Sequence, residues 1–361
     1  MKIKQYKLFY SFLRLKKPFK HGSFTRKHNI TFFIELMNEE GKKGYGEVLP
    51  RNYVTGEDKD TIYFNLRKYF KKLPNKFNSL DEISNFLYEL EPEDSRNMAS
   101  LCGLDMALLD LYAKTQDKGI SQVLCEEKGY SQKNLKPRIT SAVLGLDTAL
   151  WKKDFYCFAG FNNIKLKISP DTESKKINKL YRGFFHPATL RLDGNCSLTP
   201  KQLIQLIEEV DVPISFVEQP FPRGVSSKIK GVKLLADESL VSLEDAKTID
   251  FDAASIRIGK NGGFLRSLDI INQWEKREKP YMIGSLVGET SLLSAALLHL
   301  ASITNPFLLE GCYSPILLIE EPIKKSISPS YKGKIKFNLS APGLGNELDL
   351  SKVNYFEIER I

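Results

Sequence analysis

Residues 189–220 of the chain read TLRLDGNCSLTPKQLIQLIEEVDVPISFVEQP. An apolar run ends at Asp193, an amphipathic helical pattern follows over 198–210, and a second apolar run ends at Glu218. Short apolar runs of this kind predict buried strands, and the pattern between them predicts a helix. Strand, helix and strand in this order predict two parallel strands joined by a crossover helix.

The same unit recurs from about residue 137 onward. Helical patterns fill the intervals at 198–210, 242–249, 264–278 and 290–302. Eight strand candidates alternate with helices and therefore predict a (β/α)8-type barrel, a modified TIM barrel. In chain order these candidates are RITSAV, NIKLKI, TLRLD, ISFVE, KLLAD, ASIRI, YMIGS and FLLEG.

The first part of the chain has a different order of predicted elements: strands first, then helices. Strand patterns cover 3–14, 29–37 and 44–50, with a hairpin turn at 38–43, and helical patterns follow at 58–73, 80–91 and 95–116. We therefore expect three regions: an α+β capping domain at 1–130, the barrel at 131–325, and a C-terminal segment at 326–361 that packs back on the capping domain.

Composition narrows the class of protein. Of the 361 residues, 42% are hydrophobic and 27% charged, as in soluble globular proteins. No apolar run is long enough for a transmembrane helix, and the basic start lacks the apolar core of a signal peptide. Five scattered cysteines without a C-x-x-C spacing suit a reducing cytoplasm. The net charge of +9 leaves nucleic-acid binding as an alternative, but the lysines are spread along the chain without a recognition motif. We expect no nucleic-acid partner and no membrane.

Five of the eight predicted strands end in ionisable residues. In such barrels, active sites lie at the C-terminal ends of the strands. The alternative is a ring of surface salt bridges, which contributes little to stability and which folding does not require. We interpret these residues as a site: Lys165 and Lys167, Asp193, Glu218, Asp237 and Lys260.

Three carboxylates, from Asp193, Glu218 and Asp237, come from neighbouring strands. Converging carboxylates repel one another unless a cation joins them. Oxygen ligands favour Mg²⁺, and the set contains no histidine, which argues against zinc. Lys165 and Lys167 lie one residue apart on a strand and therefore share a face. The question is what lies opposite these two ammonium groups.

The ordered motifs K-x-K, D-x-N, E-Q-P, D-E-S and K-x-G-G resemble those of the enolase superfamily, in particular its muconate-lactonizing and dipeptide-epimerase branch. The resemblance covers nearly the whole chain, including the G-Y-G-E turn of the capping domain. It implies one Mg²⁺ on the three carboxylates, with a substrate carboxylate bound to the ion. It further implies proton transfer by Lys167 and Lys260 on opposite faces of the substrate α-carbon, with Lys165 adding positive charge. Barrels of this family are often homo-oligomers.

Supporting roles are predicted for further residues. Asn195 either hydrogen-bonds near the metal or caps the next helix, and Glu238 supports the lysines by resemblance. The loops 18–25 and 50–57 are candidate lids, or else plain surface loops. The remaining candidates for substrate contact are Ser285, Glu310, and Arg51 and Tyr53 in the second loop.

The reaction itself stays open between three hypotheses. Two bases on opposite faces suit racemisation or epimerisation of an amino-acid derivative, such as a dipeptide or an N-acyl amino acid. The same site also suits a lyase or cycloisomerase, similar to o-succinylbenzoate synthase or muconate cycloisomerase. A barrel that binds an anionic ligand without turnover is the third. Dipeptide epimerases of this branch carry D-x-D on the eighth strand, where this chain has L-E-G-C-Y, with Glu310 as its acid.

Overall fold

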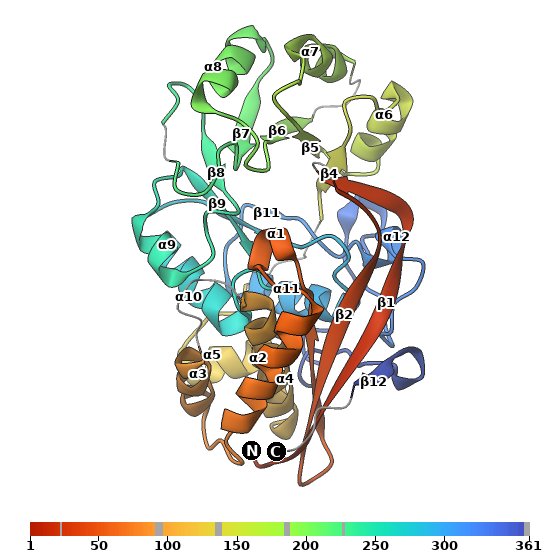
Figure 1. Ribbon diagram of the computed structural model, residues 1–361, viewed down its shortest axis with the longest axis vertical. Helices are drawn as coiled ribbons and strands as arrows, with labels where there is room; N and C mark the ends of the chain where they lie inside the picture. Colours follow the sequence, from red (N-terminus) through yellow and green to blue (C-terminus); the bar gives the residue numbers. More distant parts are fainter. Residues whose placement is uncertain (22–23, 91–96, 134–138, 184–187, 226–227, 357–361) are drawn as a thin grey trace.

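The computed structural model describes residues 1–21, 24–90, 97–133, 139–183, 188–225 and 228–356. Within them, eight parallel strands hydrogen-bond to one another in chain order, and a separate antiparallel sheet has the order β12-β1-β2-β3. In Figure 1 the strands β4 to β9 and the helices α6 to α9 form the upper part, the helices α2 to α5 lie below, and β1 and β2 run from the lower end up to the level of β4. The predicted barrel with an α+β cap is confirmed.

Each barrel strand ends at or next to the last residue of the apolar run that predicted it, except for the eighth. The strands are β4 (Ser141–Leu144), β5 (Asn163–Lys167), β6 (Thr189–Asp193), β7 (Ile214–Glu218), β8 (Leu234–Ala236), β9 (Ala253–Arg257), β10 (Tyr281–Gly284) and β11 (Leu308–Leu309). The helices between and after them are α6 (Leu150–Phe158), α7 (Ser174–Arg182), α8 (Pro200–Glu209), α9 (Leu243–Thr248), α10 (Phe264–Glu275), α11 (Ser291–Ile303) and α12 (Ser314–Leu317). Helices α6 and α7 were not predicted individually.

The first and last barrel strands meet through side chains. Among the described residues, no backbone pairing joins β4 to β11. Instead the Tyr313 hydroxyl donates to the carbonyl of Ser141 at 2.7 Å, and the Ser141 hydroxyl donates to Glu310 at 2.6 Å. These contacts bring the eighth strand's acid to the first strand, so the barrel is nearly closed and its interior is polar at this seam.

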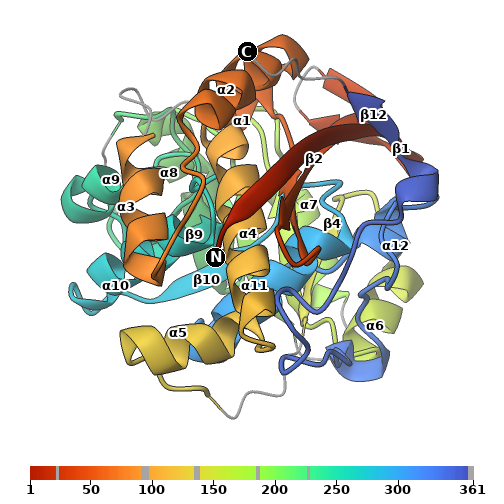
Figure 2. The ribbon, with the colours of Figure 1, turned by 90° about the horizontal axis from the view of Figure 1, so that it is seen from below.

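The cap is a sheet covered by helices. Its elements are β1 (Ile3–His21), β2 (Phe24–Asn38), β3 (Lys43–Val48), α1 (Asn52–Thr55), α2 (Lys59–Lys72), α3 (Leu80–Glu89), α4 (Met98–Thr115) and α5 (Ile120–Lys128). After α12 come two short 3-10 helices, Tyr331–Gly333 and Leu350–Lys352, and the strand β12 (Asn354–Phe356). The strand β12 pairs with β1, so the end of the described chain lies on the cap (Figures 1 and 2). The exact domain boundaries stay a prediction.

One predicted lid has a different structure. Positions 18–21 and 24–25 belong to β1 and β2, which pair far beyond the predicted strand ends, while 22–23 lie outside the described residues. The register shifts between Arg14 and Phe19. An irregular pairing of this kind breaks the alternation of apolar and polar residues, and this explains why the pattern stopped at residue 14.

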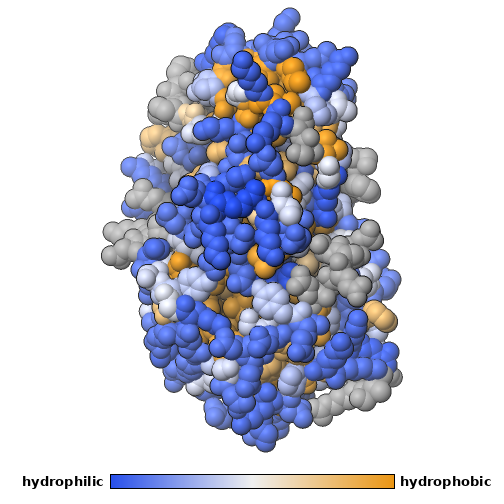
Figure 3. Space-filling view, turned by 90° about the vertical axis from the view of Figure 1, so that its left-hand side faces the viewer, coloured by the Kyte–Doolittle hydropathy of each residue, from blue (hydrophilic) through white to orange (hydrophobic). Residues whose placement is uncertain are grey.

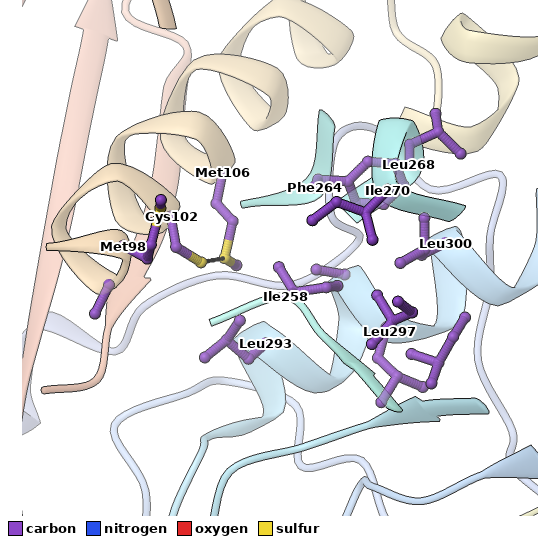
Figure 4. Packing of buried hydrophobic residues seen from close by; sticks show 14 of the residues in the cluster. Met98, Cys102, Met106, Ile258, Phe264, Leu268, Ile270, Leu293, Leu297 and Leu300 are labelled. Atoms are coloured by element: carbon purple, nitrogen blue, oxygen red, sulfur yellow. Dashed lines mark hydrogen bonds between the residues drawn. The ribbon is translucent and has the colours of Figure 1, made fainter. Parts of the chain in front are cut away.

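Helix α4 fixes the cap to the barrel. A Cβ at Gly46 would lie 1.8 Å from the carbonyl oxygen of Gly103, so β3 approaches α4 as closely as only glycine permits. Figure 4 shows Met98, Cys102 and Met106 of α4 facing side chains of α10 and α11. Charged groups continue this contact, since Asp105 accepts hydrogen bonds from the first backbone amides of α10, Phe264 at 2.8 Å and Leu265 at 3.2 Å.

The acid of the G-Y-G-E turn also joins the two parts. Glu47 is fully buried and accepts hydrogen bonds from the backbone amide and the hydroxyl of Thr290, at 2.9 and 2.6 Å, and from the amide of Leu293. Thr290 is the N-cap of α11. A carboxylate at a helix N-terminus satisfies amides that have no partner within the helix. The turn therefore orients the cap against the barrel.

The surface agrees with the composition. Figure 3 shows a mainly hydrophilic face with apolar side chains gathered near its upper end. Within the described part of the chain, no helix is both long and apolar enough to cross a membrane. All five cysteines are free thiols.

Candidate active site

The ionisable strand ends come together at one end of the barrel. In the parallel register, Lys167 lies beside Asp193, and Asp193 lies beside Glu218. Lys165, Lys167 and Asp193 line a cavity of 390 Å³, whose wall also includes residues of the cap. The two lysines share the cavity side, as alternation along the strand requires.

The predicted metal ligands are buried and bridged by cations. The Nζ atom of Lys165 lies 3.6 Å from Asp193 Oδ2 and 3.4 Å from Glu218 Oε1. Arg257 lies 3.3 Å from Glu218 Oε1 and also forms a salt bridge with Asp237. All three carboxylates are at most 2% exposed. The bridging cations offset the electrostatic repulsion between these buried carboxylates.

The three carboxylates fit Mg²⁺ in kind. They offer oxygen donors only, and Glu218 Oε2 is buried without a hydrogen-bond partner among the described residues. As placed, no three acidic, histidine or cysteine side chains of the described chain gather closely enough to hold an ion. The physical reason is that Lys165 and Arg257 each contact two of the carboxylates. A bound ion would share these oxygens with both cations.

The two lysines of β5 differ in their environment. Burial lowers the pKa of Lys165, but Glu218, Glu310 and Asp193 outweigh burial and raise that pKa above its ordinary value. Burial lowers the pKa of Lys167, and the positive charges of Lys165 and Arg257 lower it further against the opposing effect of Asp193 and Glu218. Its ammonium donates to Asn195 Oδ1 at 2.6 Å. Lys167 is thus the lysine that more readily becomes a free amine.

The second predicted base, Lys260, lies elsewhere. It is fully buried, and its Nζ donates to the carbonyl oxygens of Asp237 and Ser255 and contacts Asp237 Oδ1 at 3.0 Å. Among the described residues that line the cavity, the β9 side chain is Arg257, not Lys260. Strand β9 ends at Arg257, and Lys260 belongs to the tight turn that follows, in which the amides of Lys260 and Asn261 donate to the Arg257 carbonyl. Lys260 therefore anchors this turn beneath the cavity.

Two residues with predicted supporting roles, Asn195 and Glu238, line the cavity. Asn195 lines the cavity and receives the Lys167 hydrogen bond, whereas the N-cap of the next helix is Thr199. The predicted alternative, a capping role for Asn195, is therefore wrong. Glu238 also lines the cavity, 3.4 Å from Asn195 Nδ2. Burial, with the nearby charge of Asp237, raises the pKa of Glu238 to about 7.

The acid of the eighth strand is already paired. Glu310 lies 2.7 Å from Lys165 Nζ, forms a salt bridge with Arg191, and accepts from Ser141. Despite burial, Lys165 and Arg191 hold the pKa of Glu310 well below its usual range. Arg191 was missed in the sequence, although alternation places it two positions before Asp193 on the same face of β6.

The remaining candidates divide into two groups. Tyr53 and Ser285 line the cavity, and so does Glu289, which accepts from the backbone amide of Leu286 at 2.7 Å. Burial raises the pKa of Glu289 to about 8. Arg51 is 2% exposed and donates to the carbonyls of Pro50 and Val287, so it ties the cap to the barrel loop. In this arrangement the Arg51 guanidinium hydrogen-bonds to backbone carbonyls, so it is not placed to bind a substrate carboxylate.

Comparisons with known proteins agree with this architecture. Residues 154–352, more than half of the chain, match the family described as enolase C-terminal domain-like. The chain is 27% identical to a hydrophobic dipeptide epimerase of Enterococcus faecalis over 96% of this chain and 99% of that protein. It is also 27% identical to an o-succinylbenzoate synthase of Bacillus subtilis, over 84% of this chain and 83% of that protein.

A solved structure extends the likeness to the whole fold. The dipeptide epimerase of Cytophaga hutchinsonii, in complex with Mg and the dipeptide D-Ala-L-Val, superimposes with a TM-score of 0.83 at 22% identity, over 99% of both chains. Relatives of this chain thus include both epimerases and a synthase. The chain belongs to the enolase C-terminal domain-like family, within the enolase superfamily.

Proposed function

We propose that this protein is an enzyme that removes the α-proton of a carboxylate substrate, with Lys167 as the base. The observation that carries this proposal is the position of Lys167: its ammonium lies on the cavity wall, beside Asp193, with a pKa lowered by burial. A general base needs a pKa near the working pH and access to the substrate. Lys167 meets both conditions better than Lys165, whose pKa is raised.

The proposed metal ligands are Asp193, Glu218 and Asp237, because they offer only oxygen donors and because Glu218 Oε2, which lies 3.4 Å from Arg191 Nε, accepts no hydrogen bond from the described residues. Bound there, Mg²⁺ would act as a Lewis acid that stabilises the negative charge of a deprotonated carboxylate substrate. The protein's own residues do the rest. Lys165 keeps its proton and holds the carboxylates in place, and Asn195 orients Lys167 through the 2.6 Å hydrogen bond.

The substrate class follows from the cavity and from the relatives. Apolar side chains form much of the wall, among them Val54, Val143, Phe161, Leu286 and Leu317. Such a wall favours an apolar group attached to the reacting carboxylate. Together with the dipeptide epimerases among the relatives, this favours a dipeptide or N-acyl amino acid with an apolar side chain as substrate.

Two outcomes of the shared first step remain candidates. Epimerisation is favoured by the names of several relatives. Elimination or cycloisomerisation is favoured by a specific observation. The described residues that line the cavity include Lys165 and Lys167 from β5, but the cation from β9 is Arg257 and not a lysine. The relative named o-succinylbenzoate synthase is consistent with this second outcome.

The test is exchange of the α-proton in heavy water, measured by mass spectrometry. The panel contains apolar dipeptides, N-acyl and N-succinyl amino acids, and the precursor of o-succinylbenzoate. We expect deuterium uptake or turnover with Mg²⁺, loss of both on chelation, and loss in Lys167→Met. The matched control is Lys201→Met, which removes an exposed lysine of α8. Absence of exchange and turnover across the panel, in protein that binds Mg²⁺, refutes the proposal.

A further inference from the structure

We propose that the site transfers protons on one face of the substrate only: Lys167 removes and returns the proton, and Arg257, across the cavity, is a fixed cation. This inference rests on the proposed function and specifies its stereochemistry. It concerns a residue that the sequence motifs did not single out, and it separates the two candidate outcomes of the shared first step.

The positions of the two side chains follow from the order of the strands. Lys167 ends β5 and Arg257 ends β9, four strands further along an eight-stranded, nearly closed barrel. Strands four apart in such a barrel face each other across its axis. Both side chains line the same cavity. A substrate between them therefore presents one face to Lys167 and the other to Arg257.

Arg257 does not act as the second base. A guanidinium remains protonated in proteins and has no acceptor atom, whereas the amine of lysine titrates readily when buried. Its contacts strengthen this, because Arg257 forms salt bridges with both Asp237 and Glu218. These pairs hold the guanidinium in place, so that it supplies positive charge without accepting a proton.

Lys260 does not replace Arg257 in this role. Its Nζ is fully buried and directed to backbone carbonyls of Asp237 and Ser255. Reaching the cavity would require breaking these hydrogen bonds and displacing Arg257, whose side chain lies on the cavity side of the strand. The lysine of the K-x-G-G motif is thus a positioning residue for the turn after β9.

One side chain, Lys167, both accepts and returns the proton. The Lys167 amine takes the α-proton and becomes an ammonium, while the electron pair of the C–H bond passes into the substrate carboxylate as an enolate. The ammonium then returns a proton to the same face of the α-carbon, which restores the starting configuration. Alternatively it gives the proton to a leaving group on that face, and an alkene forms. Neither route inverts the α-carbon.

The experiment is a stereochemical analysis of exchange in heavy water. Each stereoisomer of the panel compounds is incubated with the Mg²⁺-loaded protein, and deuterium content and configuration are measured together by chiral chromatography and mass spectrometry. We expect deuterium in one stereoisomer with retained configuration, and no exchange in its mirror image. Deuterium uptake with inversion in the wild type overturns the inference but leaves the proposed function intact. Inversion that disappears in Glu289→Gln would assign the second proton to that carboxyl group.

A gain of inversion tests the assignment of position 257. Arg257→Lys places a titratable amine on the face opposite Lys167, and we expect inversion to appear in this variant. The matched control is Arg182→Lys, an exposed change on α7, which should keep retention. Exchange with unchanged retention in Arg257→Lys contradicts the placement of this residue opposite Lys167. Lack of exchange and turnover in every protein, the wild type included, refutes the proposed function and with it this inference.

Discussion

Replacing Lys165 by methionine should tighten the binding of Mg²⁺. The Lys165 ammonium is buried and contacts Asp193, Glu218 and Glu310 at 3.6, 3.4 and 2.7 Å. Two unit charges about 4 Å apart interact by about 4 kcal/mol at an effective dielectric constant of 20. Removing this competing cation should therefore increase the Mg²⁺ association constant by at least about tenfold, the equivalent of about 1.4 kcal/mol.

The same substitution should destabilise the metal-free protein. The Lys165 ammonium offsets the charges of Asp193, Glu218 and Glu310, so its loss leaves these buried carboxylates with less positive charge beside them. Breaking a buried ion pair costs about 3–5 kcal/mol. Saturating Mg²⁺ should return about 2.7 kcal/mol at a concentration about 100 times its Kd.

Isothermal titration calorimetry measures the affinity, and urea unfolding with and without Mg²⁺ measures the stability. The matched control is Lys114→Met, which breaks an ion pair with the buried Asp110 at 2.7 Å in the cap and lines no part of the cavity. The control should lose stability without a change in Mg²⁺ affinity. Equal or weaker Mg²⁺ binding in Lys165→Met would show that the carboxylates around Lys165 do not hold the ion.

Two further predictions concern the fold that supports the site. Gly46→Ala should reduce the free energy of unfolding by about 3 kcal/mol or more, because its Cβ would meet the Gly103 carbonyl at 1.8 Å. Gly145→Ala, whose Cβ would lie 3.6 Å from Thr148 Oγ1, should be nearly neutral in thermal unfolding. Burial lowers the pKa of His299 to about 4, which is below the value of about 6.5 in the unfolded chain. The unfolded chain therefore binds a proton at a higher pH than the folded protein does. The free energy of unfolding is at its full value above about pH 6.5 and falls as the pH decreases toward 4. The loss should approach about 3 kcal/mol in urea unfolding and be largely absent in His299→Leu; an identical pH dependence of the two proteins would contradict it.

Periodicity predicted the barrel because each βα unit repeats the same local physics. Apolar strands such as β6 and β7 end at the residue where the run meets its first carboxylate, Asp193 and Glu218, because a carboxylate is costly inside the barrel but favourable at its mouth. The long hairpin of β1 and β2 escaped prediction beyond residue 14, since its pairing is irregular there. Local sequence patterns therefore predict regular strands and helices better than they predict shifts in strand register.

At the end of β9, the motif and the strand alternation point to different residues. Counting by twos from Ser255 along β9 places Arg257 on the inner face at the strand end, so the signal for Arg257 was present in the sequence. The K-x-G-G motif drew attention instead to Lys260, which follows Gly259 in the turn. Whether a side chain after a strand points into the cavity depends on the turn geometry, which sequence spacing does not specify. The pairing of Glu310 with Arg191 depends likewise on contacts across the barrel.

The central claim is that Lys167 is the base, and chemical rescue tests it most directly. Lys167→Ala removes the amine from the cavity wall, and α-proton exchange of an accepted substrate should fall by about 10²–10⁴-fold. Added ethylamine, which fits the vacated space, should restore part of the exchange, and more so as the pH rises and more of the amine is free. Exchange that persists in Lys167→Ala, or that is rescued in Lys165→Ala and not in Lys167→Ala, would contradict the account.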